Sequence, residues 1–349
     1  MELPLMSTVA DKGSEEHQRR MTPGSARRSP ESVRTGCRVD ERPESAADIL
    51  PDEAPWTDKL TMLLAVVFPL LGCVAAIVLL WQVGWMGWLY VGLLVGGWLV
   101  SELGITIGFH RLLSHGSFQT YRWMRVLWMT LGALSVQGSP LVWCAVHRRH
   151  HQRSDQHGDP HSPHLHGKGW WNVLRGFYYS HMGWLFTGYW SWPDRQRYVP
   201  DLMADRWLVA CDKMYYLWVL ASLGIPAAIG GLATASWMGA LLGLLWGGLV
   251  RVFIAHHITW SINSVCHVFG SREFETRDHS RNNLLFGLLA QGEGWHNNHH
   301  AFPRSARHGL RWWQFDLSWI LIRTMELVGL AWNVRTPSER ALAAKRLSS

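Results

Sequence analysis

Two short histidine groups have the spacing with which a helix can chelate metal ions. In each group the histidines occupy positions i, i+3 and i+4, which lie on one face of an α-helix, so three imidazoles can point at one region. The groups are His147-Arg-Arg-His150-His151 and His296-Asn-Asn-His299-His300. One such string occurs often by chance on surface helices. Its repetition in one chain predicts a metal centre.

Three further histidines extend this set. His110 and His115 are five residues apart. On an α-helix this spacing separates two side chains by about 140°, so these histidines could serve different metals. His267 lies four residues after Asn263, just beyond a long apolar segment. Nine imidazoles are too many for one ion but suit two, and imidazole binds iron, zinc and copper, so ligand type alone does not choose the metal.

Carboxylates are absent from the histidine strings themselves, but several lie nearby in the chain. Metal-bound histidines usually donate their second ring N–H to an acceptor, which fixes the ring and raises its basicity. Four residues are candidates for this role, with ordinary surface charge as the alternative: Asp155, Asp159, Asp278 and Glu293.

Four apolar segments are long enough to cross a bilayer, which takes about 20 residues at 1.5 Å per residue. We expect these spans at residues 60–80, 85–107, 214–232 and 237–255. Two other apolar stretches, 123–136 and 170–189, contain Arg, His or Gly and are predicted to be interfacial helices. Lys213 and Arg251, near span ends, are expected to be solvated or snorkelling cations.

Lysine and arginine predict which way the spans point. The block from Arg111 to Arg206 carries eleven of them and the segment from Arg251 onward carries twelve, whereas the two turns between paired spans carry none. By the positive-inside rule both large blocks face the cytosol, together with both termini. The predicted fold is an all-α integral membrane protein, with four transmembrane helices and a cytosolic helical cap that holds the histidines.

The two ends of the chain differ from this membrane domain, which we place at residues 56–335. Residues 1–55 are polar, nearly lack aromatic residues and have no signal-peptide pattern, so they predict a disordered tail. Residues 336–349 are expected to form a short C-terminal tail. The net charge of +7 would attract an acidic protein carrier or anionic membrane lipid, and no nucleic-acid motif accompanies it.

Longer motifs around the histidines resemble the membrane fatty-acyl desaturases, and most closely their acyl-CoA delta-9 branch. The resemblance runs from about residue 55 to 335. Its motifs are Gly104-Ile-Thr-Ile-Gly-Phe-His110-Arg-Leu-Leu-Ser-His115, His147-Arg-Arg-His-His151, Gly158-Asp-Pro-His161, Ser180-His-Met-Gly-Trp184, Thr259-Trp-Ser-Ile-Asn-Ser-Val-Cys-His267 and Gly292-Glu-Gly-Trp-His-Asn-Asn-His-His-Ala-Phe-Pro303.

The resemblance implies a diiron enzyme that uses O2 and two electrons to introduce a cis double bond, at delta-9 of a saturated acyl-CoA. It implies that Asn263 approaches one iron through water and that nine histidines hold the two irons: His110, His115, His147, His150, His151, His267, His296, His299 and His300. No haem, flavin or dinucleotide motif is present. Electrons would come from a ferredoxin-like or cytochrome donor and its reductase, and we expect a bacterial inner membrane location.

Four residues are expected to contact the substrate by the same resemblance, and a fifth, Trp98, by its position twelve residues before His110 on the second span. Trp143 and Trp260 would line a bent acyl tunnel, and Gln137 would lie near its entrance. Trp98 could close the far end, and Arg206 would meet the phosphates of CoA.

The chain departs from the family in two places. Ala145-Val146 replaces an Arg-Asp pair that contacts CoA in animal relatives, which puts the acyl carrier in doubt, and Glu102 replaces a small residue inside a span. We interpret Glu102 as a buried polar contact between spans.

Two other functions are compatible with this pattern. A hydroxylase or alkane monooxygenase has the same metal architecture. After one hydrogen is abstracted from the substrate, oxygen rebounds to that carbon instead of a second hydrogen being abstracted. A histidine-rich metal-binding or transport protein is the alternative from another class. Transport sites usually lie at mid-bilayer on broken helices, whereas these histidines lie at span ends and between spans. A desaturase is therefore the favoured function.

Overall fold

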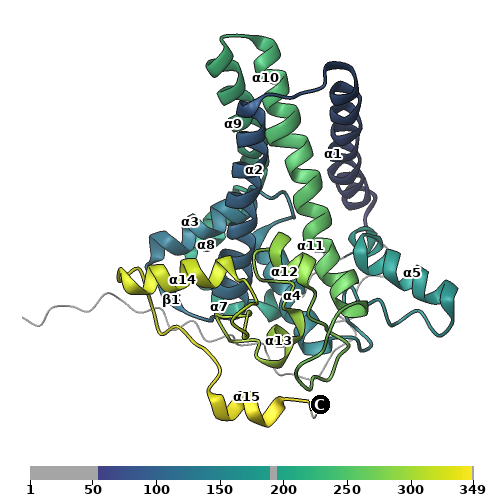
Figure 1. The fold of residues 1–349 in the computed structure, drawn as a ribbon, viewed down its shortest axis with the longest axis vertical. Helices are drawn as coiled ribbons and strands as arrows, with labels where there is room; N and C mark the ends of the chain where they lie inside the picture. The colour runs from purple at the N-terminus through teal and green to yellow at the C-terminus, as the bar shows by residue number, and fades with distance from the viewer. Residues whose placement is uncertain (1–53, 189–194, 348–349) are drawn as a thin grey trace, which may run out of the picture. The chain divides into compact units, whose positions relative to one another are not determined.

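Four helices in the computed structural model are long and apolar enough to cross a membrane. The structure describes residues 54–188 and 195–347, so the predicted disordered tail at 1–55 lies almost entirely outside the described residues. The first span is α1 (Trp56–Val83) and the third is α9 (Tyr215–Thr234). The second and fourth are each continued by a π-helical turn, as described next. The structure thus has four candidate spans in the predicted order (Figure 1).

Spans two and four are longer than predicted because each runs on toward the histidines. The second is α2 (Trp88–Leu103) followed by the π-helix η2 (Gly104–Ser114). The fourth is α10 (Trp237–Gly243), the π-helix η4 (Leu244–Val250) and α11 (Arg251–Val268). His110 and His267 therefore lie inside these helices instead of in loops beyond them. A continuous helix positions side chains more rigidly than a loop does. Such a helix carries His110 in the second span and His267 in the fourth.

The segment between the two span pairs folds into short helices instead of further spans. It comprises α3 (Arg122–Ala133), α4 (Pro140–Arg153), α5 (Trp170–His181), η3 (Gly183–Phe186), α6 (Arg195–Tyr198), α7 (Pro200–Met203) and α8 (Arg206–Lys213). The predicted interfacial stretches correspond to α3 and α5, each of 12 residues and too short to cross a bilayer. On α5, Trp170, Trp171 and Leu174 are exposed, as an interfacial helix requires.

The segment after the fourth span completes the histidine-bearing part of the fold. It comprises α12 (Leu284–Leu289), α13 (His296–Ala301), α14 (Leu317–Leu327) and α15 (Glu339–Lys345). The strands β1 (Gln119–Thr120) and β2 (Ala331–Trp332) pair antiparallel. This pairing joins the segment that follows η2 to the segment that follows α14. The predicted C-terminal tail contains α15, and Lys345 Nζ donates to the carbonyl of Ala301 at 2.7 Å.

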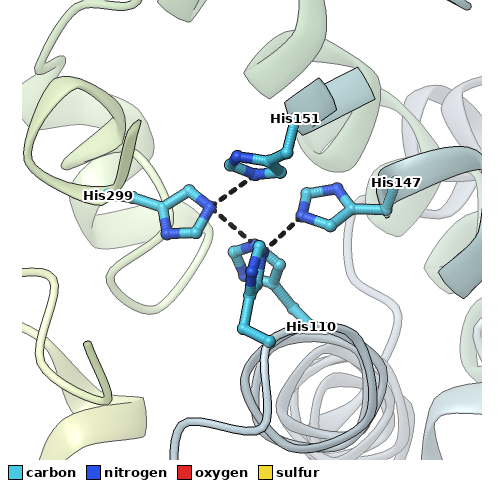
Figure 2. Close-up of side chains that lie close together, drawn as sticks. His110, His147, His151 and His299 are labelled. Atoms are coloured by element: carbon cyan, nitrogen blue, oxygen red, sulfur yellow. Dashed lines mark hydrogen bonds between the residues drawn. The ribbon is translucent and has the colours of Figure 1, made fainter. Parts of the chain in front are cut away.

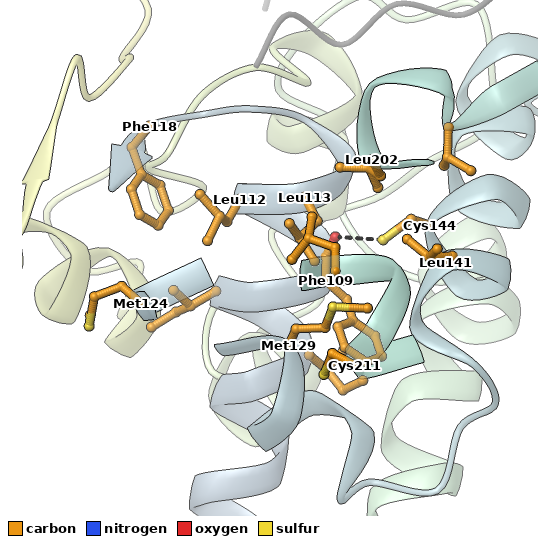
Figure 3. Packing of buried hydrophobic residues seen from close by; sticks show 14 of the residues in the cluster. Phe109, Leu112, Leu113, Phe118, Met124, Met129, Leu141, Cys144, Leu202 and Cys211 are labelled. Atoms are coloured by element: carbon orange, nitrogen blue, oxygen red, sulfur yellow. Dashed lines mark hydrogen bonds between the residues drawn. The ribbon is translucent and has the colours of Figure 1, made fainter. Parts of the chain in front are cut away.

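A continuous hydrophobic core supports the histidine-bearing helices from one side (Figure 3). Phe109 and Leu113 of η2 pack in this core with Met129 of α3 and Leu141 of α4. Glycine permits the close packing of η2 on α3, because a Cβ at Gly104 would lie 2.1 Å from a backbone nitrogen of α3. Because η2 and α4 both contribute side chains to this core, apolar burial holds the helices that present His110 and His147 against each other.

Candidate metal centre

All nine predicted histidines converge in two adjacent groups. Within each group the ligand atoms all lie within 4.8 Å of one another. One group contains His110, His115, His147, His151 and His299, and the other contains His150, His267, His296 and His300. The prediction that these residues gather in space, made from spacing and resemblance, agrees with this arrangement. Figure 2 shows the labelled members of the first group, His110, His147, His151 and His299, with their ring nitrogens directed inward.

The helical setting of His110 and His115 corrects the expectation that they could serve different metals. They lie at the end of a π-helix, in which the backbone hydrogen bond joins residues five apart, so residues five apart lie nearly above one another. The His115 backbone N–H donates to the His110 carbonyl at 3.1 Å, and the two rings are 4.8 Å apart. Both imidazoles consequently belong to the same group.

Each histidine triplet is divided between the two groups, whereas the spacing suggested one region for each. From α4, His147 and His151 face the first group and His150 faces the second. From α13, His299 joins the first group, and its two neighbours in the triplet join the second. Because α4 and α13 both contribute to both groups, the relative position of these two helices fixes the separation of the two candidate metal sites.

Facing ring nitrogens in both groups lie within hydrogen-bond distance of one another. His299 Nε2 is 3.0 Å from His110 Nε2 and 2.8 Å from His151 Nε2, as the dashed lines in Figure 2 mark. His115 Nε2 and His147 Nε2 are 2.8 Å apart. In the second group, His267 Nε2 and His296 Nε2 are 3.0 Å apart. Converging imidazole nitrogens of this kind fit a transition-metal ion between them.

The opposite ring nitrogens of four of these histidines meet carboxylates, which supports the same interpretation. All four acceptors expected from the sequence occupy this role. The pairs are His110 Nδ1 with Glu293 at 2.6 Å, His150 Nδ1 with Asp159 at 2.9 Å, His267 Nδ1 with Asp155 at 3.0 Å and His300 Nδ1 with Asp278 at 2.7 Å. A carboxylate at Nδ1 holds the tautomer that leaves the Nε2 lone pair free for a metal.

Burial sets the protonation states that metal binding needs. It lowers the pKa of His147 and His299 well below the ordinary value, so these imidazoles are neutral at pH 7. Burial also lowers the pKa of His300, to about 4. Burial alone would raise the pKa of Asp278, but attraction to His300 and His267 and hydrogen bonds from His300 and Ser280 together outweigh it and hold that pKa below its usual range. A histidine binds a metal ion when its imidazole is neutral, and these pKa values give neutral imidazoles beside ionised carboxylates.

Replacing Asp278 by Asn should weaken metal binding without removing a ligand. The amide lacks the negative charge of the carboxylate, whose oxygen accepts from His300 Nδ1 at 2.7 Å. Loss of such a partner typically lowers metal affinity by about 10–100-fold. Metal bound per chain after dialysis against a graded chelator series measures the effect. The matched control is Glu339→Gln on the exposed start of α15, which should leave the chelator midpoint unchanged. Equal midpoints for all three proteins would contradict the role of Asp278.

One buried histidine at this centre escapes sequence reasoning. His308 Nδ1 lies 3.1 Å from Glu293, and the rings of His308 and His299 are 4.5 Å apart. Glu293 therefore meets His308 as well as His110, and its other oxygen accepts from Arg111 Nε at 3.1 Å. His308 stands alone in the sequence, outside both triplets, so no spacing signal indicates it.

A largely apolar cavity of about 810 Å³ reaches the first histidine group. It lies among α1, α4, α9 and α11, and His147 forms part of its wall. Trp143, Trp260 and Gln137 line it, which are the positions expected to contact an acyl chain. Asn263 lines this cavity and also a smaller one of about 40 Å³ shared with His150 and His296.

The two other residues expected to contact substrate lie away from this cavity wall. Trp98 packs in a separate apolar cluster with Ile258 and Ile262, against α12. Arg206 begins α8, where its guanidinium lies 5.4 Å from the centre of the Trp207 ring. Ala145, at the place of the Arg-Asp pair, is buried in the core, and Val146 lines the cavity.

Comparison with known proteins assigns this architecture. Residues 83–336 match the fatty acid desaturase family model. The chain belongs to the fatty acid desaturase family. It is 43% identical over 284 residues to the hex-5-enoyl-[acyl-carrier protein] acetylenase of Moorena producens, covering 81% of this chain and 88% of that protein. The family assignment makes this chain an oxidoreductase of lipid metabolism.

Other desaturase relatives differ in the carrier that their names state. The chain is 37% identical to the sn-1 stearoyl-lipid 9-desaturase of Anabaena variabilis, over 72% of this chain and 86% of that protein. It is 38% identical to the icosanoyl-CoA 5-desaturase of Limnanthes douglasii, over 74% of this chain and 67% of that protein. Relatives of similar identity are thus named for carrier-protein, lipid and CoA substrates.

Proposed function

We propose that this desaturase introduces a cis double bond at delta-9 of a saturated acyl chain, using O2 and two irons. The observation that supports it best is the meeting of the apolar cavity with the histidine groups at His147 and Asn263. When bound, two irons supply the oxidising power to break unactivated C–H bonds. The overall change consumes O2, two electrons and two protons, removes one hydrogen from each of two adjacent carbons, and releases two water molecules.

The protein's own part in this reaction is to bind, orient and exclude water. The nine histidines would hold the two irons, and the four carboxylates keep their rings in the ligand tautomer. Trp143 and Val146 give the cavity an apolar wall beside His147, so a methylene segment can lie there without competing water. Asn263, which lines both cavities, would hold water near the second group.

The carrier proposed from the sequence is CoA, and the experiment compares it with the alternatives. Purified protein is given stearoyl-CoA, stearoyl-acyl-carrier protein or stearoyl glycerolipid in bilayers, with a reductase and electron carrier. Oleoyl product from one of them supports the proposal and names the carrier. Hydroxylated product would instead indicate a hydroxylase or alkane monooxygenase. Bound zinc with no O2-dependent product from any carrier would favour a metal-binding or transport protein.

We further propose a cytoplasmic face on a bacterial inner membrane, with electrons from an external ferredoxin-like or cytochrome donor. Exposed arginines on the histidine-bearing side, such as Arg277, Arg304 and Arg311, would attract an acidic carrier. Raising salt from 50 to 500 mM should therefore slow carrier-driven turnover by about tenfold. Turnover driven by a small chemical reductant is the control and should not change. Equal salt responses in both assays would contradict electrostatic docking.

A further inference from the structure

Glu102 is a carboxylate buried inside the second span, close to the histidine groups. Its side chain is 1% exposed on α2, and a buried carboxylate in an apolar span is costly unless it is hydrogen-bonded. Oε1 accepts from the Thr259 hydroxyl of α11 at 3.5 Å, which is the polar contact between spans that the sequence suggests. Among the described residues, none makes a hydrogen bond to Oε2.

The contact between Glu102 and Thr259 ends a directed chain of side-chain hydrogen bonds. Trp143 Nε1–H donates to Gln137 Oε1 at 3.4 Å, and Gln137 Nε2–H donates to Thr259 Oγ1 at 2.8 Å. The Thr259 hydroxyl then donates to Glu102. Every donor points toward the carboxylate. Glu102, which accepts at this end of the chain, sets the direction in which the other three groups point.

This chain runs along the wall that divides the two cavities. Trp143, His147, Thr259 and Asn263 line both the large apolar cavity and the small one. Of these two cavities, Glu102 lines only the small one. At about 40 Å³, and with Asn263, Thr259 and Glu293 also in its wall, the small cavity has the volume and polar groups to hold water that satisfies Oε2.

We propose that Glu102 is a positioning residue that fixes the cavity wall against which the acyl chain lies beside His147. The proposal rests on the proposed desaturase function. The Trp143 ring stacks on the His147 imidazole at 5.1 Å with an interplanar angle of 18°, so the orientation of Trp143 affects where a chain can pass this ligand. Glu102 thereby restricts which pair of carbons faces the metal centre.

Loss of the carboxylate releases this wall in a defined way. Without an acceptor on α2, the Thr259 hydroxyl can donate to Gln137 Oε1 once the Gln137 amide turns over. Gln137 Nε2–H then faces Trp143 Nε1–H, so Trp143 loses its acceptor. A less fixed indole lets the chain shift by one or more methylenes. We expect the wild type to make one dominant double-bond position and Glu102→Leu to place more than about a tenth of its double bonds elsewhere. Glu102→Gln keeps a carbonyl acceptor and should restore the single position.

The experiment measures double-bond position by mass spectrometry of derivatised products for wild type, E102Q, E102L, T259V and the E102L/T259V double variant. If Glu102 acts through Thr259, the double variant broadens the product distribution no more than either single one. Val100→Leu, on the lipid-exposed side of α2, is the matched control and should behave as wild type. Iron bound per chain should be equal in all, because Glu102 holds no metal.

A second readout is independent of turnover. In metal-free protein labelled with 5-fluorotryptophan, the ¹⁹F signal of Trp143, assigned with Trp143→Phe, should move in E102L and return in E102Q. An unchanged product distribution together with an unmoved Trp143 signal would overturn the inference. Additive effects in the double variant would also overturn it. If the wild type makes no unsaturated product, the proposed function fails, whereas a desaturating wild type with unaffected variants defeats only the role of Glu102.

Discussion

His299→Ala should abolish product formation and reduce the bound iron from two ions to one per chain. His299 is fully buried, and its Nε2 lies 3.0 Å from His110 Nε2 and 2.8 Å from His151 Nε2. Alanine removes an imidazole at the centre of the first group. The second group, to which His299 does not belong, should keep its metal. Because the proposed two-electron chemistry needs both ions, we expect activity to fall by at least about a thousandfold.

The control for this variant is a histidine that lies outside both groups. His157 is exposed in the segment after α4, so His157→Ala should retain full iron content and turnover. Iron is measured by elemental analysis of detergent-purified protein, and turnover by product analysis from the same preparation. Two ions bound by His299→Ala would contradict the assignment. Loss of both ions, with a thermal midpoint equal to that of the metal-free wild type, would show that the groups do not bind independently.

Elements with strong periodic signals were predictable from the sequence. The four spans follow from apolar length alone, and the triplets at His147 and His296 follow from helical periodicity. The carboxylates at Asp155, Asp159 and Glu293 were expected from proximity in the chain and from what a metal-bound imidazole needs. In each case the residue type is decided by the chain nearby, through apolar length, helical periodicity or a carboxylate close in sequence. A local pattern is therefore sufficient to find the residue.

The remainder depended on contacts between distant segments. The pairing of His110 with His115 requires a π-helix, and no periodicity rule for α-helices predicts where one forms. Arg251 was expected to snorkel, yet it is 3% exposed and donates to Ser101, Ser222 and the Leu134 carbonyl. These partners lie on other elements, more than 25 positions away. His308 likewise acquires its place only when its segment folds back onto Glu293.

Arg111→Leu should cause a large loss of stability and a loss of iron from the first group. The Arg111 side chain is fully buried, and its Nε donates to Glu293 at 3.1 Å, while Nη1 donates to Asp316 at 2.9 Å and to the Ala306 carbonyl at 2.8 Å. Leucine leaves two buried carboxylates without their cation, and removing one partner of such a network costs about 3–5 kcal/mol. Glu293 also loses a group that orients it toward His110 Nδ1, so metal affinity should fall as well.

Arg125→Leu separates these two effects, because Arg125 is equally buried but remote from the histidines. It is 3% exposed and its Nη1 donates to Asp205 at 2.7 Å, between α3 and the start of α8. Both variants should lower the thermal unfolding midpoint in detergent. Since only Arg111 reaches a carboxylate that holds a ligand, only Arg111→Leu should shift the chelator midpoint for iron. An equal chelator shift in both would mean that iron loss follows from general destabilisation, and an unchanged midpoint in Arg111→Leu would mean that Glu293 keeps its orientation without the guanidinium.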